Sequence, residues 1–182
     1  PPLCVDCSDR RAGEISQHVA MARHVAADAS PLIGLATAGV LPVLRDLFGT
    51  VMITRLVKDE ITGDPRRPGA QELDAAMRDG WIRVAPAPPE TWRIGGVDAG
   101  EASTIALAAE HDGALVLMDD ALGRAQAAAH GLEILDVAGV LLAAKRALLI
   151  GGVKPLVAGL GGRGLTIAED ARLALLRDAG EQ

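Results

Sequence analysis

Five short apolar segments recur along the chain, and each is separated from the next by a stretch with helical character. These segments are residues 24–28, 51–53, 81–84, 114–118 and 133–135. Short apolar strands that alternate with helices indicate a parallel sheet, because parallel neighbours need a crossover connection and helices then cover both faces. The chain is therefore predicted to be an α/β protein, a three-layer α/β/α sandwich with a mostly parallel central sheet.

Helices are expected between these strands and after the last one. The expected ranges are 31–39, 40–48, the end of the second strand to about 61, 71–79, 98–110, 121–129 and 137–149, with further helix beyond and a break at 159–164. Residues 23–182 are predicted to form a single domain. Residues 1–22 are polar and lack periodicity, and Met21 would be a natural start, so this segment is expected to be an N-terminal extension outside the fold.

Composition limits the partners of such a domain. The formal net charge is −6, and the chain holds two tryptophans, one phenylalanine and no tyrosine. This balance excludes a basic surface for tight non-specific nucleic-acid binding and an aromatic platform for base stacking. The longest uncharged stretch, residues 29–44, is too short to span a bilayer and is interrupted by proline and glycine. Because the N-terminus has no secretion signal and only Cys4 and Cys7 are cysteines, a cytoplasmic location without membrane contact is expected.

Acidic residues follow two of the predicted strands. Asp28 ends the first strand, and Asp119 and Asp120 end the fourth. Sites in parallel sheets form beyond the carboxyl ends of the strands, so these three side chains are candidate site residues. Asp120 has a second interpretation, because it could equally cap the helix expected from residue 121.

Two glutamates on predicted helices are further candidates. Glu101 follows Asp98 at the spacing of a capping box, but it also shares a helix face with Ile105 and Ala108 that points toward the sheet. Glu60 is a lone glutamate on a helix, a pattern more typical of a solvated surface. Carboxylates that converge in one cavity repel one another unless a divalent cation offsets their charge or one acid stays protonated. An all-oxygen ligand set without histidine or cysteine favours Mg²⁺ or Mn²⁺.

Four motifs occur in an order and spacing that resemble a known family. They are D-A-S-P-L-I at 28–33, V-K-D-E at 57–60, G-E-A-S-T-I-A-L-A at 100–108 and D-D-A-L-G-R at 119–124. Together they resemble a less-studied branch of the PIN-domain ribonucleases of the VapC type, from about residue 24 to about residue 178. The chain departs from that branch at Thr54, where proline is usual, and at Asp136-Val137, which replaces a Gly-Thr pair.

The resemblance implies a PIN-like fold and a metal-dependent endoribonuclease that hydrolyses RNA phosphodiester bonds. It implies that Asp28, Glu60, Glu101 and one or both of Asp119 and Asp120 form the catalytic site. The candidate ligands of Mg²⁺ or Mn²⁺ are Asp28, Glu101 and either or both of Asp119 and Asp120. It also implies the toxin of a toxin–antitoxin pair, with RNA as substrate, a cognate antitoxin protein as partner and a homodimer as a further assembly. The alternative is a catalytically silent PIN-like module that only binds a partner protein.

Two residues within the motifs have open roles. Ser30 could hold Asp28 or a phosphate oxygen, or it could be the N-cap of a helix with Pro31 at its first position. Arg124 could contact a phosphate, or it could simply pair with an acid.

Other patterns support less. The glycine-rich run at 159–164 matches G-x-G-x-x-G but follows no clear strand, so a turn between helices is expected there. Cys4 and Cys7 are half of a zinc site and are expected to lie in a tail. A Mg²⁺-dependent receiver domain would need a lysine at the end of a late strand, and neither Lys145 nor Lys154 is so placed. No serine or cysteine nucleophile motif supports a triad hydrolase.

Overall fold

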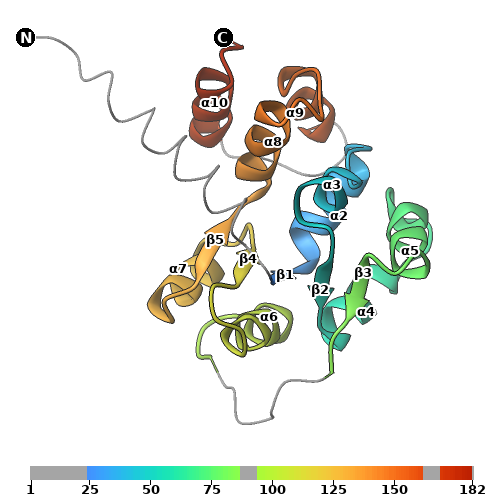
Figure 1. The fold of residues 1–182 in the computed structure, drawn as a ribbon, viewed down its shortest axis with the longest axis vertical. Helices are drawn as coiled ribbons and strands as arrows, with labels where there is room; N and C mark the ends of the chain where they lie inside the picture. Colours follow the sequence, from blue (N-terminus) through green and yellow to red (C-terminus); the bar gives the residue numbers. More distant parts are fainter. Residues whose placement is uncertain (1–23, 87–93, 162–168, 182) are drawn as a thin grey trace, which may run out of the picture.

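The computed structural model describes residues 24–86, 94–161 and 169–181 (Figure 1). Its strands form one sheet in the order β3-β2-β1-β4-β5, and every neighbouring pair is parallel. The strands are β1 (Val25–Ala27), β2 (Val51–Ile53), β3 (Ile82–Val84), β4 (Leu115–Leu117) and β5 (Glu133–Leu135). The predicted α/β class with a parallel central sheet is therefore confirmed.

Helices connect and flank these strands. They are α2 (Ala29–Thr37), α3 (Val43–Phe48), α4 (Arg55–Thr62), α5 (Ala70–Arg78), α6 (Ala99–Ala109), α7 (Ala121–Ala129), α8 (Val137–Arg146), α9 (Lys154–Gly161) and α10 (Glu169–Asp178). In the described part of the chain, none of them is long and apolar enough to cross a membrane. The extension expected at 1–22, with Cys4 and Cys7, lies outside the described residues, and so does part of the run at 159–164; those expectations stay predictions.

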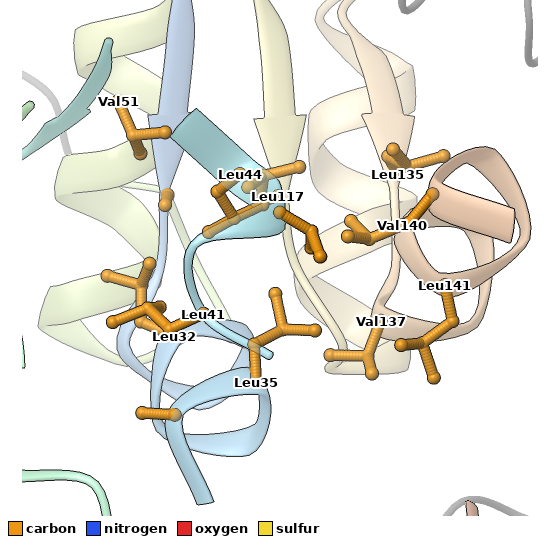
Figure 2. Packing of buried hydrophobic residues seen from close by; sticks show 14 of the residues in the cluster. Leu32, Leu35, Leu41, Leu44, Val51, Leu117, Leu135, Val137, Val140 and Leu141 are labelled. Carbon is orange, nitrogen blue, oxygen red and sulfur yellow. The ribbon is translucent and has the colours of Figure 1, made fainter. Parts of the chain in front are cut away.

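The sheet separates two apolar clusters, because alternate strand residues face opposite sides. On one face, Val25 and Leu117 pack with side chains of α2, α3 and α8. Figure 2 shows this packing between the strands and the three helices. On the other face, Val116 and Met118 pack with Ile105 of α6 and with α7. Helices on both faces make the predicted three layers, visible in Figure 1.

The first helix begins earlier than predicted. Asp28 has extended backbone angles and is the N-cap of α2, so the helix starts at Ala29 rather than at Pro31. Ser30 therefore lies inside the first turn, exposed to solvent, and its interpretation as the N-cap is wrong. Aspartate and serine are both good caps, and Pro31 is tolerated in the first turn because the N–H it lacks would have no helical partner there.

Other helix ends differ from the prediction by a few residues. The segment 40–48 is helical only from Val43, after Pro42, and α8 stops at Arg146 instead of continuing to residue 149. Leu148 follows α8 with a φ of 60°, and the N–H of Leu149 donates to the carbonyl of Ala144. This is the arrangement of a Schellman stop, which normally has glycine at the left-handed position, so a leucine there gives no sequence signal for the end of the helix.

The strand order creates a switch point beside β1. From β1 the chain moves outward through β2 to β3, and β4 then returns to the opposite side of β1. Ala27 of β1 and Leu117 of β4 are partners in register, so the two strands end side by side. In doubly wound sheets the crevice outside the carboxyl ends at such a point is where ligands bind. The residues after β1 and β4 are those that the sequence singled out as acidic.

Candidate active site

Asp28 is the most buried acid at the switch point. Asp28 is only 5% exposed and comes directly after β1. Its backbone N–H donates to the carbonyl of Leu117 at 3.0 Å, which extends the β1–β4 pairing by one residue and fixes where the carboxylate starts. Asp28 thus leaves the sheet at a rigid position, where its carboxylate faces the crevice.

Three carboxylates surround the first turn of α6. A Cβ placed on Gly100 would lie 3.2 Å from Asp98 Oδ1 and 3.6 Å from both Asp28 Oδ1 and Glu60 Oε2. Oxygens from the end of β1, from α4 and from the start of α6 therefore meet around one backbone position. A residue with a side chain at position 100 would add atoms to the space between these oxygens, so the glycine keeps that space open.

Burial and like charge act together on Asp28. The pKa of Asp28 is raised to about 6, mainly because the carboxylate is buried and in part because of the charges of Glu60 and Asp98. The backbone N–H groups of Ala29 and Ser30 at the start of α2 act in the opposite direction without cancelling the shift. A pKa near neutrality means that ionising this carboxylate is costly in its surroundings. Such a group is stabilised by a positive charge brought into the crevice.

Glu101 satisfies both interpretations that its sequence position suggested. The N–H of Asp98 donates to Glu101 Oε2 at 3.2 Å, and the N–H of Glu101 donates to Asp98 Oδ1 at 2.8 Å, so the capping box is formed. Burial raises the pKa of Glu101, and the charges of Asp98, Asp120 and Glu60 act in the same direction. The carboxylate therefore caps α6 and faces the acidic crevice as well.

The carboxyl group of Glu101 also faces α7. A Cβ on Gly123 would lie 3.4 Å from Glu101 Cδ and would collide with the Met118 side chain. Gly123 therefore allows the first turn of α7 to pack closely against the end of β4 and against Glu101. Close packing therefore explains why a glycine stands at this position of the D-D-A-L-G-R motif.

Asp119 and Asp120 separate at the end of β4. Asp119 Oδ1 accepts from the backbone N–H of Val137 at 2.9 Å, so its carboxylate is fixed to the start of α8. Burial raises the pKa of Asp119, the charge of Asp136 raises it further, and Arg124 lowers it. Asp120 is exposed and caps α7, accepting from the N–H of Leu122 at 2.8 Å, so its predicted capping role is confirmed.

The two further candidates are linked to the acids through backbone atoms, because the backbone N–H of Ser30 donates to the Asp28 carboxylate and the Arg124 side chain donates to the backbone of Asp119. Ser30 is exposed on the first turn of α2, next to Asp28 in sequence. Arg124 donates from Nη1 to the backbone carbonyl of Asp119 rather than to a side chain. Its guanidinium is partly exposed beside the crevice, which leaves part of it open to an incoming anion.

The predicted acids form two groups. Asp28, Glu60 and Glu101 lie around Gly100, with Asp120 close enough to act on Glu101. Asp119 interacts with Val137, Asp136 and Arg124 on the β5 side. Asp98 and Asp136, acids that the sequence did not nominate, each raise the pKa of a nominated one. The Asp98-x-x-Glu101 spacing was the available signal for Asp98, but it suggested only a cap.

The chemistry of the donor atoms suits a hard cation better than the present arrangement of the side chains does. Across residues 24–86, 94–161 and 169–181, no lysine or arginine forms an ion pair with a carboxylate of either group. In this same part of the chain, no three Asp, Glu, His or Cys side chains are arranged to hold one metal ion as they stand. The donors are all oxygens, and among the described residues only the nearby charge of Arg124 offsets that of Asp119, which fits Mg²⁺ or Mn²⁺. The predicted ligand set of Asp28, Glu101, Asp119 and Asp120 stays a prediction.

Comparison with known proteins identifies one family. The family model described as DUF3368, PIN domain, matches residues 24–181. The match covers all five strands and the elements that carry the acids. Comparisons with curated proteins and with solved structures give no significant match.

Proposed function

The chain belongs to this PIN-domain family, and on that premise we propose that it is a metal-dependent endoribonuclease that hydrolyses RNA phosphodiester bonds. PIN domains are generally nucleases and typically use divalent metals, so a hydrolase of the nuclease type is the coarse function. The finer proposal adds a cytoplasmic toxin of a toxin–antitoxin pair, with RNA as substrate, a cognate antitoxin as partner and a homodimer as a further assembly.

One observation carries the proposal. Asp28 sits buried at the switch point with a pKa raised to about 6, and oxygens of Glu60 and Asp98 approach the same turn of α6. A chain that needed only to fold would be more stable with fewer uncompensated acids here. Perturbed carboxylates gathered at the ligand-binding edge of a sheet are typical of a catalytic site.

The residues take distinct roles in this proposal. Asp28, Glu101, Asp119 and Asp120 would hold Mg²⁺ or Mn²⁺, which supplies a water of lowered pKa when bound. Glu60, exposed at the rim beside Gly100, would orient the attacking water or accept its proton. Arg124, partly exposed next to Asp119, would contact a phosphate oxygen of the RNA.

The proposal predicts that removal of either buried acid abolishes cleavage. The full chain should cut single-stranded RNA with Mg²⁺ or Mn²⁺ and stop when a chelator is added. Asp28→Asn and Asp119→Asn keep size and shape, so each should fold and lose cleavage by about a hundredfold or more, as the loss of an electrostatic contact to a transition state does. Fragment release on a denaturing gel measures the rate.

Asp112→Asn is the matched control, because Asp112 lies in the exposed turn before β4, at the opposite edge of the sheet. This variant should cleave at the wild-type rate. Full activity of Asp28→Asn would refute the proposed role of that acid. A wild-type chain that cleaves no RNA with either metal, yet binds a protein partner, would support the catalytically silent module instead.

A further inference from the structure

A buried pair of hydroxyl groups joins the two helices that carry Glu60 and Glu101. Thr54 Oγ1 and Ser103 Oγ lie 2.8 Å apart, and the two residues are 1% and 8% exposed. Thr54 is the N-cap of α4, and Ser103 lies in the first turns of α6. This pair is the link between two elements that are 49 residues apart in sequence.

The surrounding contacts assign the direction of every hydrogen bond in this link. Ser103 Oγ donates to the carbonyl of Gly100 at 2.8 Å, which uses its only proton. Thr54 Oγ1 must then donate to Ser103, and Thr54 in turn accepts from the N–H of Val57 at 3.2 Å. One directed chain therefore runs from the backbone of α4 through both hydroxyls to the backbone of α6. Every proton and acceptor in it is used, as a buried polar network requires.

The chain of hydrogen bonds ends on the residue at the centre of the acidic group. The Cβ direction of Gly100 opens between Asp28 Oδ1 and Glu60 Oε2. Repulsion between the acids pushes α4 and α6 apart, because Glu60 belongs to one helix and Glu101 to the other. The Thr54–Ser103 link opposes that separation from beneath the crevice. Proline, usual at position 54 in the branch that the sequence resembles, has no hydroxyl to make it.

We propose that Thr54 and Ser103 are positioning residues that hold α4 and α6 together beside the acidic site and so set its affinity for a divalent cation. Neither residue touches substrate or ion; both act through the helices that carry Glu60 and Glu101. The inference rests on the proposed function, since it concerns the metal affinity of the same site. It goes further by naming what sets that affinity.

The test measures Mn²⁺ binding directly, by electron paramagnetic resonance of free Mn²⁺ during titration of the full chain. Ser103→Ala removes the acceptor but leaves the Thr54 cap of α4 in place. It should weaken Mn²⁺ binding about three- to tenfold, the effect of one lost buried hydrogen bond. The Mn²⁺ concentration for half-maximal cleavage should rise by the same factor, with kcat at saturating metal little changed.

Thr104→Val is the matched control. Thr104 is as buried as Ser103, lies on the same helix and donates to the same carbonyl of Gly100, at 3.0 Å, but it makes no link to α4. Its loss should leave Mn²⁺ affinity unchanged. Thr54→Ser keeps the hydroxyl and should bind Mn²⁺ as the wild type does.

The double variant separates this role from a general loss of stability. If the two hydroxyls act as one link, adding Ser103→Ala to Thr54→Val should weaken Mn²⁺ binding no further, because Thr54→Val has already removed the link together with the cap of α4. Effects that multiply, or a Ser103→Ala chain that binds Mn²⁺ as tightly as the wild type, would overturn the inference and leave the proposed function standing. A wild-type chain that binds no Mn²⁺ would overturn both.

Discussion

Asp28 shows how a single residue can lower stability for the sake of a site. Its pKa of about 6 in the folded protein stands above the ordinary value of 3.8. The folded state therefore holds the proton more tightly than the unfolded state does. The contribution of Asp28 to the free energy of unfolding should be greatest below about pH 4 and should fall as the pH rises toward 6, where the carboxylate ionises within the fold.

This linkage predicts that Asp28→Asn stabilises the metal-free protein at neutral pH. The gain should be about 1–3 kcal/mol, because the pKa shift is about two units and each unit corresponds to about 1.4 kcal/mol. Denaturant unfolding at pH 7 and pH 4 measures it, and the gain should shrink at pH 4. Asp112→Asn, at the exposed opposite edge, should change neither value.

Saturating Mn²⁺ should reverse the order, since a cation that binds the folded state stabilises only the chain that can hold it. A metal-free Asp28→Asn protein that is less stable than the wild type at pH 7 would show that the buried carboxylate stabilises the fold. That outcome would remove the main support for a functional acid at this position.

At the residue scale, the sequence predicted the acids that follow strands and missed those that act through the fold. Asp28 and Asp119 were found because the end of an apolar run is a local signal. Asp98 appeared only as a cap, although the structure also places its charge beside Asp28 and Glu101. The Thr54–Ser103 contact joins positions 49 residues apart, and no local pattern records it. The prediction of Ser30 as the N-cap was wrong because Asp28, an equally good capping residue, stands two positions earlier.

At the scale of elements, one carboxylate joins the last three helices. Glu181 accepts from the N–H groups of Val153 and Lys154 at the start of α9, at 2.9 Å and 2.8 Å, and it pairs with Lys145 of α8. Lys145 also donates to the carbonyl of Ala179, just after α10. The Lys145 side chain and the backbone N–H groups together lower the pKa of Glu181 to about 2.

Glu181→Gln should loosen this junction without disturbing the sheet. Because the pKa of Glu181 is lowered in the folded state, this group stabilises the fold at pH values above its ordinary pKa of 4.5. This contribution is lost as the pH falls from about 4.5 toward 2. Amide hydrogen exchange at Val153 and Lys154 should therefore quicken in the variant at pH 7. The difference from the wild type should narrow as the pH falls through that window.

Asp178→Asn is the control, because Asp178 forms its ion pair with its neighbour Arg177 at the end of α10 rather than with α8 or α9 as far as these helices are described. Exchange at the two amides should not change in that variant. Equal exchange rates in Glu181→Gln and the wild type at pH 7 would mean that the junction is held by apolar packing alone.

Strands were predicted more accurately than helix ends, for a physical reason. Most strands lie in a short apolar run between polar turns, although β3 contains Arg83 and β5 begins with Glu133, and the observed strands fall inside all five predicted segments. Helix ends depend on caps and on tertiary contacts. Leu148 stops α8 in a left-handed conformation that leucine adopts reluctantly, so nothing in the local sequence announces the stop.

At the scale of the whole molecule, charge limits how the proposed RNA substrate can be bound. The chain has 18 basic and 24 acidic residues, with few aromatic side chains. In the described part of the chain, most ion pairs join exposed residues that are close in sequence, such as Arg55 with Asp59 and Arg78 with Asp74. Scattered arginines without a stacking platform favour weak binding that depends on phosphate contacts.

We therefore expect RNA affinity to fall steeply with salt. Asp119→Asn, which should bind without cutting, provides the complex, and fluorescence anisotropy of labelled single-stranded RNA measures it with Mg²⁺ present. Affinity should drop by about tenfold or more between about 50 and about 200 mM salt. A tight, salt-insensitive complex would contradict this expectation and would point to base-specific contacts.

The central claim is that the carboxylates at the switch point hold a divalent cation. The most direct test is a crystal of the full chain soaked in Mn²⁺, with anomalous scattering recorded near the manganese edge. The account predicts a peak in contact with the carboxylates of Asp28 and Asp119, at about 2.2 Å from their oxygens. A well-ordered crystal at saturating Mn²⁺ with no peak at these residues, or with its only peak elsewhere, would contradict it.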